Sequence, residues 1–288
     1  MIGTALKTEL ADHGHQVRCL TRSPGGDYQW TALPGSVPGE AVDWADALVS
    51  LNGASLTHLP WTAAYRRLIE SSRVDATAAL AQAVRDCENP PSVWVSGSAV
   101  GFYGDRGEEQ VDESSPPGDS FLATVVQAWE QAARPALGHT RVVWARTGIV
   151  LGPEGALKPL AAVTRVGLGA RLGSGAQWWP WVSLADEVRA MEFALGATSL
   201  AGPIDIVSPV PARAHDISRA VARILRRPHV MRVPAVVLRS VLGGADELLL
   251  ASQRVAPTAL LDAGFQFEHT DVVGAIRAAW GSEGAVRA

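Results

Sequence analysis

The sequence predicts an α/β fold, a doubly wound parallel sheet with a small C-terminal α+β lobe. The 288 residues suit one large α/β unit with an appendage, and 47% of them are hydrophobic, which supplies a core. Short apolar runs, each the length of a buried strand, alternate with longer segments of helical period. Because an order of strand, helix and strand is typical of parallel sheets, this alternation decides the fold class.

The elements follow from the alternation in chain order. Two linkers interrupt it, at residues 23–40 and 104–119, because both are dense in Gly, Pro, Ser and Asp. The second linker lies where open α/β sheets bind their ligands. The predicted strands are residues 16–20, 47–51, 92–96, 141–146 and 203–207, and the predicted helices are residues 1–14, 61–86, 121–136 and 184–195.

After Gly152 the pattern changes to shorter helices and single strands. We therefore divide the chain into a sheet domain, residues 1–152, and a lobe, residues 153–288, some segments of which return to the sheet. Within the tryptophan-rich stretch 178–182, the proline excludes a central strand, and the serine that follows resembles a helix cap. The stretch predicts a rim strand that leads into a helix.

Composition excludes several classes of partner. The net charge of −4 supplies no positive field to hold a phosphate backbone, so we expect no nucleic acid. The two cysteines, Cys19 and Cys87, are too few for a disulfide scaffold and indicate a reducing cytoplasm. No apolar run reaches the ~18 residues that span a bilayer, so we expect no membrane partner. The apolar segment 230–250 contains arginines and carboxylates and predicts packed helices.

The seven histidines are scattered along the chain. His13 and His15 flank Gly14 at the end of the first predicted helix, where a cation complements the helix dipole. We infer no metal site from them.

The first residues form a helix without a strand before it. In a dinucleotide-binding unit, the first strand ends in a glycine-rich turn that lets the backbone approach the pyrophosphate at the helix N-terminus. Gly3 suits the last of those glycines. We therefore expect the sheet to lack its first strand and hypothesise a misassigned start codon, which upstream codons without an apolar run and a glycine-rich turn would contradict. The alternative is that the chain begins with this helix.

Thr21 and Arg22 directly follow the strand that is predicted to end at Leu20. An NAD-specific fold places an acidic residue here for the ribose hydroxyls. A guanidinium instead suits a 2′-phosphate, with which it forms two hydrogen bonds, and a neighbouring hydroxyl adds another. The pair favours NADP over NAD, and the alternative is a solvated surface arginine.

Ten short motifs carry a family resemblance over nearly the whole chain. They lie at residues 2–6, 21–24, 50–54, 72–73, 96–105, 146–152, 167–169, 173–178, 252–255 and 263–265. In this order they resemble the extended short-chain dehydrogenase/reductase superfamily, and within it the YfcH-type proteins labelled nucleoside-diphosphate-sugar epimerases.

The resemblance implies a Rossmann-type domain that binds NADP(H), with the lobe closing over a substrate cleft. It implies cofactor contacts at Gly3, Thr21, Arg22, Leu51, Asn52, Leu68, Arg73, Ser96 and Val150, with Val150 beside the nicotinamide. The alternatives are that Arg73 is a neighbour of Glu70 on a solvated helix face and that Leu68 belongs to the core.

The cleft motifs favour a ligand beyond the cofactor, and we assign substrate contacts to Arg146, Gln177 and Trp181. The glycine-rich stretch 167–175, followed by Gln177 and three tryptophans, can accept a planar or sugar-like ligand by stacking. The alternative is that the tryptophans pack in the core.

The resemblance does not extend to the superfamily's proton-transfer residues. Its enzymes use a tyrosine whose pKa is lowered by a lysine four residues later. The only lysines here are Lys7 and Lys158, and neither follows a tyrosine at that spacing. The two positions fall on Leu122 and Val126, which are inert.

Ser98 and Tyr103 are the remaining catalytic candidates, and both are weak. Ser98 matches the superfamily's catalytic serine approximately, and its hydroxyl can bond a substrate oxygen or satisfy backbone at a strand end. Tyr103 can replace the lost acid, but a phenol at its reference pKa of ~10 is a poor base at neutral pH. The carboxylates of the same loop are typical of a solvated acidic surface.

Two hypotheses of different class follow. The first is an NADP(H)-dependent oxidoreductase or epimerase-like enzyme that acts on an unknown small substrate, such as a nucleotide sugar, without the tyrosine and lysine pair. The second is a catalytically silent NADP(H)-binding sensor or regulatory protein. The helices at 61–86 and 121–136 occupy the superfamily's usual dimer face, so a homodimer and intramolecular packing are both open.

Overall fold

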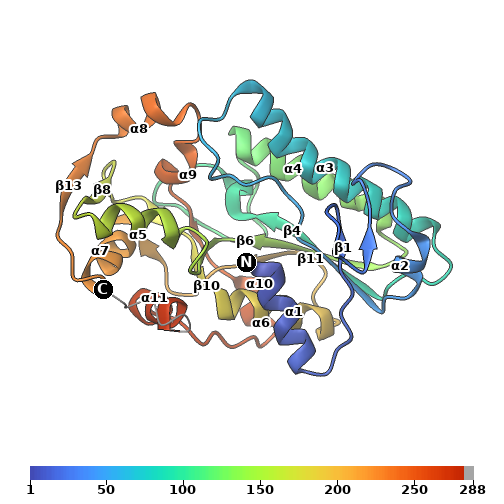
Figure 1. The fold of residues 1–288 in the computed structure, drawn as a ribbon. Helices are drawn as coiled ribbons and strands as arrows, with labels where there is room; N and C mark the ends of the chain where they lie inside the picture. Colours follow the sequence, from blue (N-terminus) through green and yellow to red (C-terminus); the bar gives the residue numbers. More distant parts are fainter. Residues whose placement is uncertain (282–288) are drawn as a thin grey trace.

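A four-stranded parallel sheet forms the centre of the structure, a computed structural model that describes residues 1–281 (Figure 1). Its strands lie in the order β11 (Gly202–Ile206), β6 (Arg141–Thr147), β4 (Val93–Ala99) and β3 (Ala47–Ser50). All three pairings are parallel. The predicted strands at 47–51, 92–96, 141–146 and 203–207 are confirmed to within a few residues, and with them the α/β class.

Alternate side chains of these strands enter two different cores. Val95 and Val143 belong to a core shared with α1 (Ile2–Asp12) and α6 (Leu184–Gly196). Trp94 and Trp144 point to the other face of the sheet, where they pack with α3 (Ala63–Asp86). Because successive side chains of a strand face opposite sides, the strands are apolar on both faces, as a sheet between two helix layers requires.

The helix layers lie on opposite sides of the sheet in Figure 1. On one side α3 packs along α4 (Phe121–Ala133), and on the other α1 packs along α6. Hydroxyl groups cap three of these helices at predicted starts: Thr62, Ser120 and Ser183 each accept a hydrogen bond from a backbone N–H of the first turn.

The strand predicted at 16–20 is shorter than expected. Only Leu20–Thr21 (β1) is a strand, and it pairs in parallel with β2 (Tyr28–Gln29) in a separate two-stranded sheet. The backbone N–H of Cys19 donates to Asp27 Oδ2 at 2.7 Å, so it is not available for a hydrogen bond to a neighbouring strand. Within residues 1–281, no strand pairs with the edge of β3 that faces away from β4.

A further core forms mainly from the part of the chain after Gly152. The side chains of Leu151, Trp179, Trp181, Ile217 and Ile276 meet there. They come from β7 (Ile149–Leu151), β9 (Trp178–Trp179), β10 (Trp181–Ser183), α7 (Ala214–Ile224) and α11 (Val272–Gly281). The rim strand predicted at 178–182 is present as β9 and β10, and β10 leads directly into α6.

The prediction of packed helices over 230–250 is wrong in its first part. His229–Val233 is a strand, β13, paired in parallel with β8 (Gly169–Leu172). The β-branched residues Val230 and Val233 favour a strand, and the next helix, α8 (Ala235–Leu242), begins only after Pro234. Within residues 1–281, no helix combines the length and apolar character that crossing a bilayer demands.

Segments of the lobe return to the sheet layers, because α6 and β11 both follow Gly152 in the chain. Residues 282–288 of the predicted lobe lie outside the described residues. The remaining elements are α2 (Gly39–Asp43), η1 (Val100–Tyr103), β5 (Gln110–Val111), η2 (Arg134–Ala136), α5 (Leu157–Arg165), β12 (Ala212–Arg213), α9 (Glu247–Leu250), β14 (Arg254–Val255) and α10 (Thr258–Asp262).

Candidate functional site

The first turn of α1 lies against the loop that follows β3. A Cβ atom built on Gly3 would lie 3.8 Å from Leu51 Cδ1, so the structure brings these two predicted cofactor residues together. Among residues 1–281, no side chain caps the N-terminus of α1, where Met1 is the N-cap residue. The backbone N–H groups of a first helical turn have no acceptor within their own helix, and together with the helix dipole they favour an anion.

The loop after β3 is held in shape by the next helix. Asn52 Nδ2 donates to the carbonyl of Ser72 at 3.1 Å, while Asn52 Oδ1 is buried without a hydrogen-bond partner among residues 1–281. Arg73 Nη2 donates to the Ala54 carbonyl at 3.2 Å. A Cβ on Gly53 would lie only 2.9 Å from Arg73 Cζ, so glycine lets the loop approach the guanidinium.

Arg73 therefore faces this loop and not Glu70. Its Nη1 also donates to the Ile69 carbonyl at 2.8 Å, and its guanidinium carbon lies 5.3 Å from the centre of the Trp129 ring. Burial lowers the pKa of Arg73. The Arg73 side chain therefore orders the loop after β3, which we expect the cofactor to contact.

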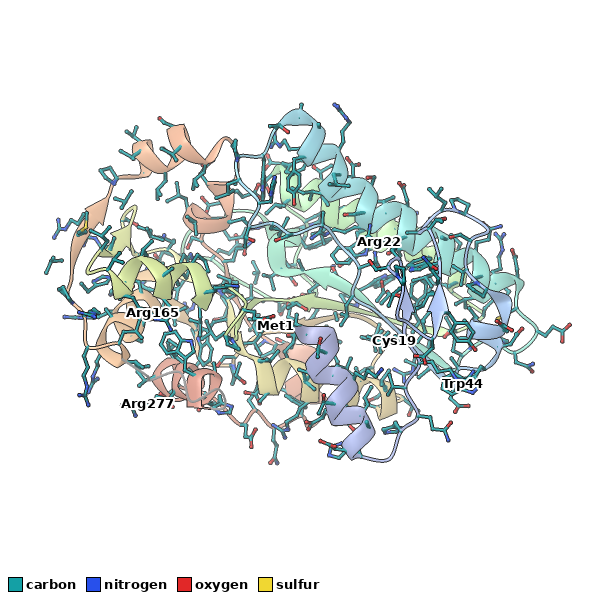
Figure 2. The ribbon with its side chains drawn as sticks, in the orientation of Figure 1. Met1, Cys19, Arg22, Trp44, Arg165 and Arg277 are labelled. Carbon is teal, nitrogen blue, oxygen red and sulfur yellow. The ribbon has the colours of Figure 1, made fainter. Side chains whose placement is uncertain are left out.

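Arg22 follows directly on β1 and is exposed (Figure 2). Its guanidinium has no hydrogen bond or ion pair to any of residues 1–281, which leaves all its donors for a ligand. Thr21 Oγ1 donates to the carbonyl of Ser23 at 2.6 Å, and Gly26 packs so close that a Cβ there would clash with the same hydroxyl. The turn that presents Arg22 is thus fixed by Thr21.

Three further predicted cofactor residues differ in accessibility. Leu68 lies on α3 with 45% of its surface exposed, which argues against a core role. Ser96 is fully buried within β4, and Val150 is buried in β7, where it pairs with Val182 of β10. Ser96 is followed by Gly97. A Cβ atom built on Gly97 would lie 2.9 Å from the carbonyl oxygen of Ser50, so β3 and β4 approach closely at their carboxyl ends.

A buried polar network lies at the carboxyl ends of β4 and β6. Arg146 donates to both carboxylate oxygens of Glu130, from Nε at 2.8 Å and from Nη2 at 3.0 Å. Ser98 Oγ donates to the same Glu130 at 2.6 Å. Arg146 Nη1 donates to the Tyr103 hydroxyl at 3.0 Å, and that hydroxyl donates to Asp205 Oδ2 at 2.7 Å. The network joins both weak catalytic candidates to one arginine.

Tyr103 is enclosed in this network with no exposed surface. Burial and the neighbouring Asp205 carboxylate raise the pKa of Tyr103. Burial also raises the pKa of Asp205 well above its usual range, and the charge of Glu113 adds to this. A phenol that is enclosed and harder to ionise is a poor acid or base, so the geometry lends no support to Tyr103 as the replacement for the lost tyrosine.

The positions at which we expect the superfamily's tyrosine and lysine are apolar and packed. Leu122 and Val126, on α4, are both buried. A Cβ on Gly101 of η1 would lie 3.6 Å from Leu122 Cβ and 3.9 Å from Val126 Cγ2. The structure therefore puts hydrocarbon against the turn after β4.

The polar atoms of Gln177 and Trp181 are used within the protein. Gln177 Nε2 donates to the carbonyls of Leu172, at 3.2 Å, and Leu249, at 2.7 Å. Trp181 Nε1 donates to the Val210 carbonyl at 3.0 Å, and its ring lies in the core of the lobe. Both side chains fix the lobe, which agrees with the alternative that the tryptophans pack in the core.

Sequence reasoning did not identify Asp205, Glu130 or Glu187 as parts of a buried site. Glu187 is completely buried on the first turn of α6, where it accepts a hydrogen bond from Thr147 Oγ1 at 2.6 Å, and its second oxygen has no partner among residues 1–281. Burial raises the pKa of Glu187 to about 8. The sequence holds a signal for Asp205 alone, a carboxylate inside the apolar strand run 203–207.

The raised pKa of Glu187 predicts a fall in stability with rising pH. Between about 4.5 and about 8 the native state holds a proton that the unfolded chain has released, so the free energy of unfolding falls by about 1.4 kcal/mol per pH unit from this group. Glu187→Gln keeps the neutral form at every pH. Urea unfolding should show the variant close to wild type near the acid end of this window and clearly more stable at its alkaline end.

The control for this prediction is Glu154→Gln, which changes an exposed carboxylate. Its stability should follow the wild-type pH profile. Identical profiles for Glu187→Gln and wild type would show that the Glu187 proton does not contribute.

Two surface hollows, each of about 370 Å³, lie away from these residues. One is lined by residues of α1, α6 and the segment 264–266 together with His13, and the other by the segment 35–43, which includes α2, and by the end of α3 with the two residues after it.

Comparison with known proteins identifies matching families over most of the chain. Residues 1–207 match the NAD dependent epimerase/dehydratase family, and residues 233–279 match a domain of unknown function, DUF1731. The epimerase family protein Mb2239 of Mycobacterium bovis is 39% identical over 278 residues, which cover 94% of this chain and 92% of that protein.

Two solved structures are similar over nearly all of this chain. The human epimerase family protein SDR39U1 (isoform 2), crystallised with NADPH, is 30% identical with a TM-score of 0.87, over 97% of this chain and 95% of that one. A nucleoside-diphosphate sugar epimerase from Corynebacterium glutamicum is 33% identical with a TM-score of 0.81, over 98% of this chain and 56% of that one.

Proposed function

This chain belongs to the NAD dependent epimerase/dehydratase family, and on that premise we propose that it is an NADP(H)-dependent oxidoreductase or epimerase-like protein that acts on a small substrate. The observation that carries the proposal is Arg22, an exposed guanidinium without a partner among residues 1–281, on a turn fixed after β1. It is the group that separates NADP(H) from NAD(H).

The residues at this edge of the sheet fit such a cofactor. Asn52 Oδ1 is a buried acceptor without a partner within the described chain, and burying such an atom is costly unless a ligand or water bonds it. The first turn of α1, at Gly3, offers backbone N–H groups to a diphosphate. Leu51 and Leu68 expose apolar surface. The human relative crystallised with NADPH supports the same cofactor here.

In the proposed mechanism Arg22 holds the 2′-phosphate, Thr21 fixes the turn that presents Arg22, and Leu51, Leu68 and Val150 contact the rings. When bound, the cofactor supplies or accepts a hydride at its nicotinamide. Arg73 keeps the loop after β3 in shape, through its bonds to the carbonyls of Ile69 and Ala54.

Ser98 is the residue that we propose to bond a substrate oxygen. Glu130 accepts the proton of its hydroxyl, which leaves the lone pairs of Ser98 Oγ for a donor on the substrate. Arg146 fixes Glu130 through two hydrogen bonds, and Tyr103 and Asp205 fix Arg146 in turn. We propose that Arg146, Gln177 and Trp181 position the cleft without touching the substrate.

A second candidate function is favoured by Leu122 and Val126. Both are buried hydrocarbon at the positions of the superfamily's proton-transfer pair. A protein with this arrangement can bind NADP(H) and signal its redox state to a partner without turnover.

Turnover distinguishes the two functions. The NADPH-loaded and NADP-loaded protein is incubated with a panel of nucleoside-diphosphate sugars and small carbonyl compounds, while nicotinamide absorbance and sugar NMR signals are followed. Conversion that falls in Ser98→Ala supports the enzyme. Tight cofactor binding without conversion of any compound supports the sensor.

We further propose a cytoplasmic location, supported by the two free cysteines, Cys19 and Cys87. A homodimer through the outer faces of α3 and α4 remains our proposal for the assembly. Within the chain these two helices already pack along each other.

A further inference from the structure

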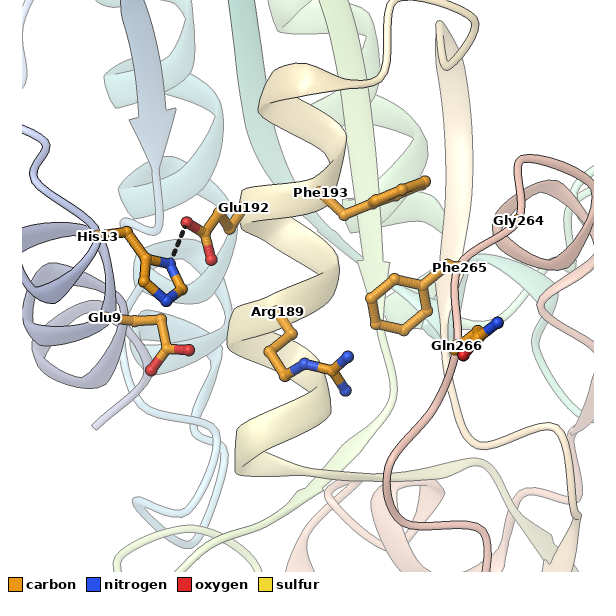
Figure 3. Close-up of a pocket in the computed structure, with 8 residues that line it drawn as sticks. All are labelled: Glu9, His13, Arg189, Glu192, Phe193, Gly264, Phe265 and Gln266. Carbon is orange, nitrogen blue, oxygen red and sulfur yellow. Dashed lines mark hydrogen bonds and ion pairs between the residues drawn. The ribbon is translucent and has the colours of Figure 1, made fainter.

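The end of α1 and the middle of α6 bring two carboxylates and one imidazole together, as Figure 3 shows. Glu9 lies on the last turns of α1 and His13 is the residue that caps its C-terminus, and both side chains project toward α6. Glu192 projects toward them from α6. The sequence alone shows His13 and His15 near the end of this helix. It does not reveal Glu192, which lies far along the chain.

The side chains are close enough to share one ion. A nitrogen or oxygen atom from each of Glu9, His13 and Glu192 lies within 4.8 Å of the others. His13 Nδ1 is 2.6 Å from Glu192 Oε1, and His15 Nε2 is 4.0 Å from the same oxygen. Glu9, His13 and Glu192 also line the hollow of about 370 Å³ between the two helices, so an ion can enter from solvent.

We propose that Glu9, His13, His15 and Glu192 form a binding site for a divalent transition-metal ion of the Zn²⁺ type, which clamps α1 to α6. Two imidazoles and two carboxylates are a donor set that suits Zn²⁺. Zn²⁺ holds such ligands at about 2.0–2.2 Å in a tetrahedron. Both histidines are more than half exposed, so their rings are not enclosed by the core, and the ion would replace the hydrogen bond between His13 and Glu192.

The neighbouring arginine does not oppose a cation. Arg189 lines the same hollow, but its Nη1 lies 3.2 Å from Asp186 Oδ1 and 3.9 Å from Glu268 Oε2. Its charge is therefore balanced by carboxylates on its own side. Glu9 and Glu192 leave the opposite side negative.

The clamp would join elements that already share a core. Leu6 and Leu10 of α1 pack with Val188 and Met191 of α6. A metal bound only by the folded chain stabilises it by mass action, so Zn²⁺ should raise the melting temperature. This site lies apart from the proposed cofactor residues, and its test does not depend on them.

The test is calorimetric titration of untagged, chelator-treated protein with Zn²⁺. Wild type should bind one ion per chain, and His13→Gln and Glu192→Gln should each lower the affinity at least about tenfold, since even loss of a supporting group costs that much. The side chain in His13→Gln can still donate a hydrogen bond to Glu192. The variant therefore distinguishes a role of His13 as a metal ligand from a role limited to its hydrogen bond with Glu192. Co²⁺ in place of Zn²⁺ should give intense visible bands of a four-coordinate site.

Two control variants sharpen the result. His139→Gln changes an exposed histidine with no side-chain partner among residues 1–281, and His269→Gln changes the group of Asp186, Glu268 and His269, the other candidate cluster within that range. Both should bind Zn²⁺ like wild type. No saturable binding by wild type, or an affinity unchanged in His13→Gln and Glu192→Gln, would overturn the proposal.

Discussion

Replacing Arg22 with alanine should weaken NADPH binding about tenfold to about 100-fold and leave NADH binding nearly unchanged. Hydrogen bonds to a charged partner contribute about 1.5–3 kcal/mol, and each 1.4 kcal/mol is about a factor of ten in affinity. The guanidinium has no competing partner within residues 1–281, so this energy is available to the 2′-phosphate alone. Quenching of tryptophan fluorescence by each cofactor measures both affinities.

Arg134→Ala is the matched control for this prediction, because Arg134 is also exposed but lies in η2, at the far end of α4. It should leave the NADPH affinity at the wild-type value. Equal losses of NADPH and NADH affinity in Arg22→Ala would refute the 2′-phosphate assignment.

Replacing Arg146 with methionine should lower the free energy of unfolding by about 3–5 kcal/mol, the cost of leaving a buried carboxylate without its cation. The side chains of Arg146 and Glu130 are only 4% and 12% exposed, so water cannot take the place of the lost partner. Methionine keeps much of the length and apolar contact of the arginine stem. Urea unfolding, followed by circular dichroism, measures the loss.

Two further variants grade this result. Tyr103→Phe removes one hydroxyl from the same network and leaves Asp205 Oδ2 without its donor, so it should cost about 1–3 kcal/mol. Arg85→Met breaks an ion pair with Asp86 in which both side chains are about half exposed, and it should cost less than about 1 kcal/mol. A loss in Arg146→Met no larger than in Arg85→Met would contradict a structural role for the network.

The sheet could be predicted from the sequence because its strands are apolar on both faces. In the first half of β4 and the middle of β6, valines and tryptophans alternate between two cores, so these stretches are hydrophobic and mark the strands. The caps at Thr62, Ser120 and Ser183 mark helix starts for a local reason, since their partners lie in the next turn. Interactions within a few residues leave a pattern in the sequence.

The polar network could not be predicted, because its members are brought together only by the fold. Asp205 reaches Tyr103 because β11 and β6 pair in parallel, and Arg146 stands opposite Asp205 in that pairing. No spacing along the chain reveals this contact. The sequence does not reveal the strand at His229–Val233 for the same reason: its partner, β8, lies far along the chain in the glycine-rich stretch 167–175, for which we expect ligand contacts.

The cofactor residues could be predicted only in part. Their positions came from a family pattern, and the structure adds what the pattern lacked: the contact of Gly3 with Leu51, the buried free acceptor on Asn52, and the turn below Arg22. These observations support the assignment to NADP(H), which remains a prediction.

Titration of the wild-type chain with NADPH and with NADH tests that assignment most directly. We predict saturable binding of NADPH at least about tenfold tighter than that of NADH, which matches the energy of one charged contact to the 2′-phosphate. Binding of neither cofactor, or NADH affinity equal to or above that of NADPH, would contradict it.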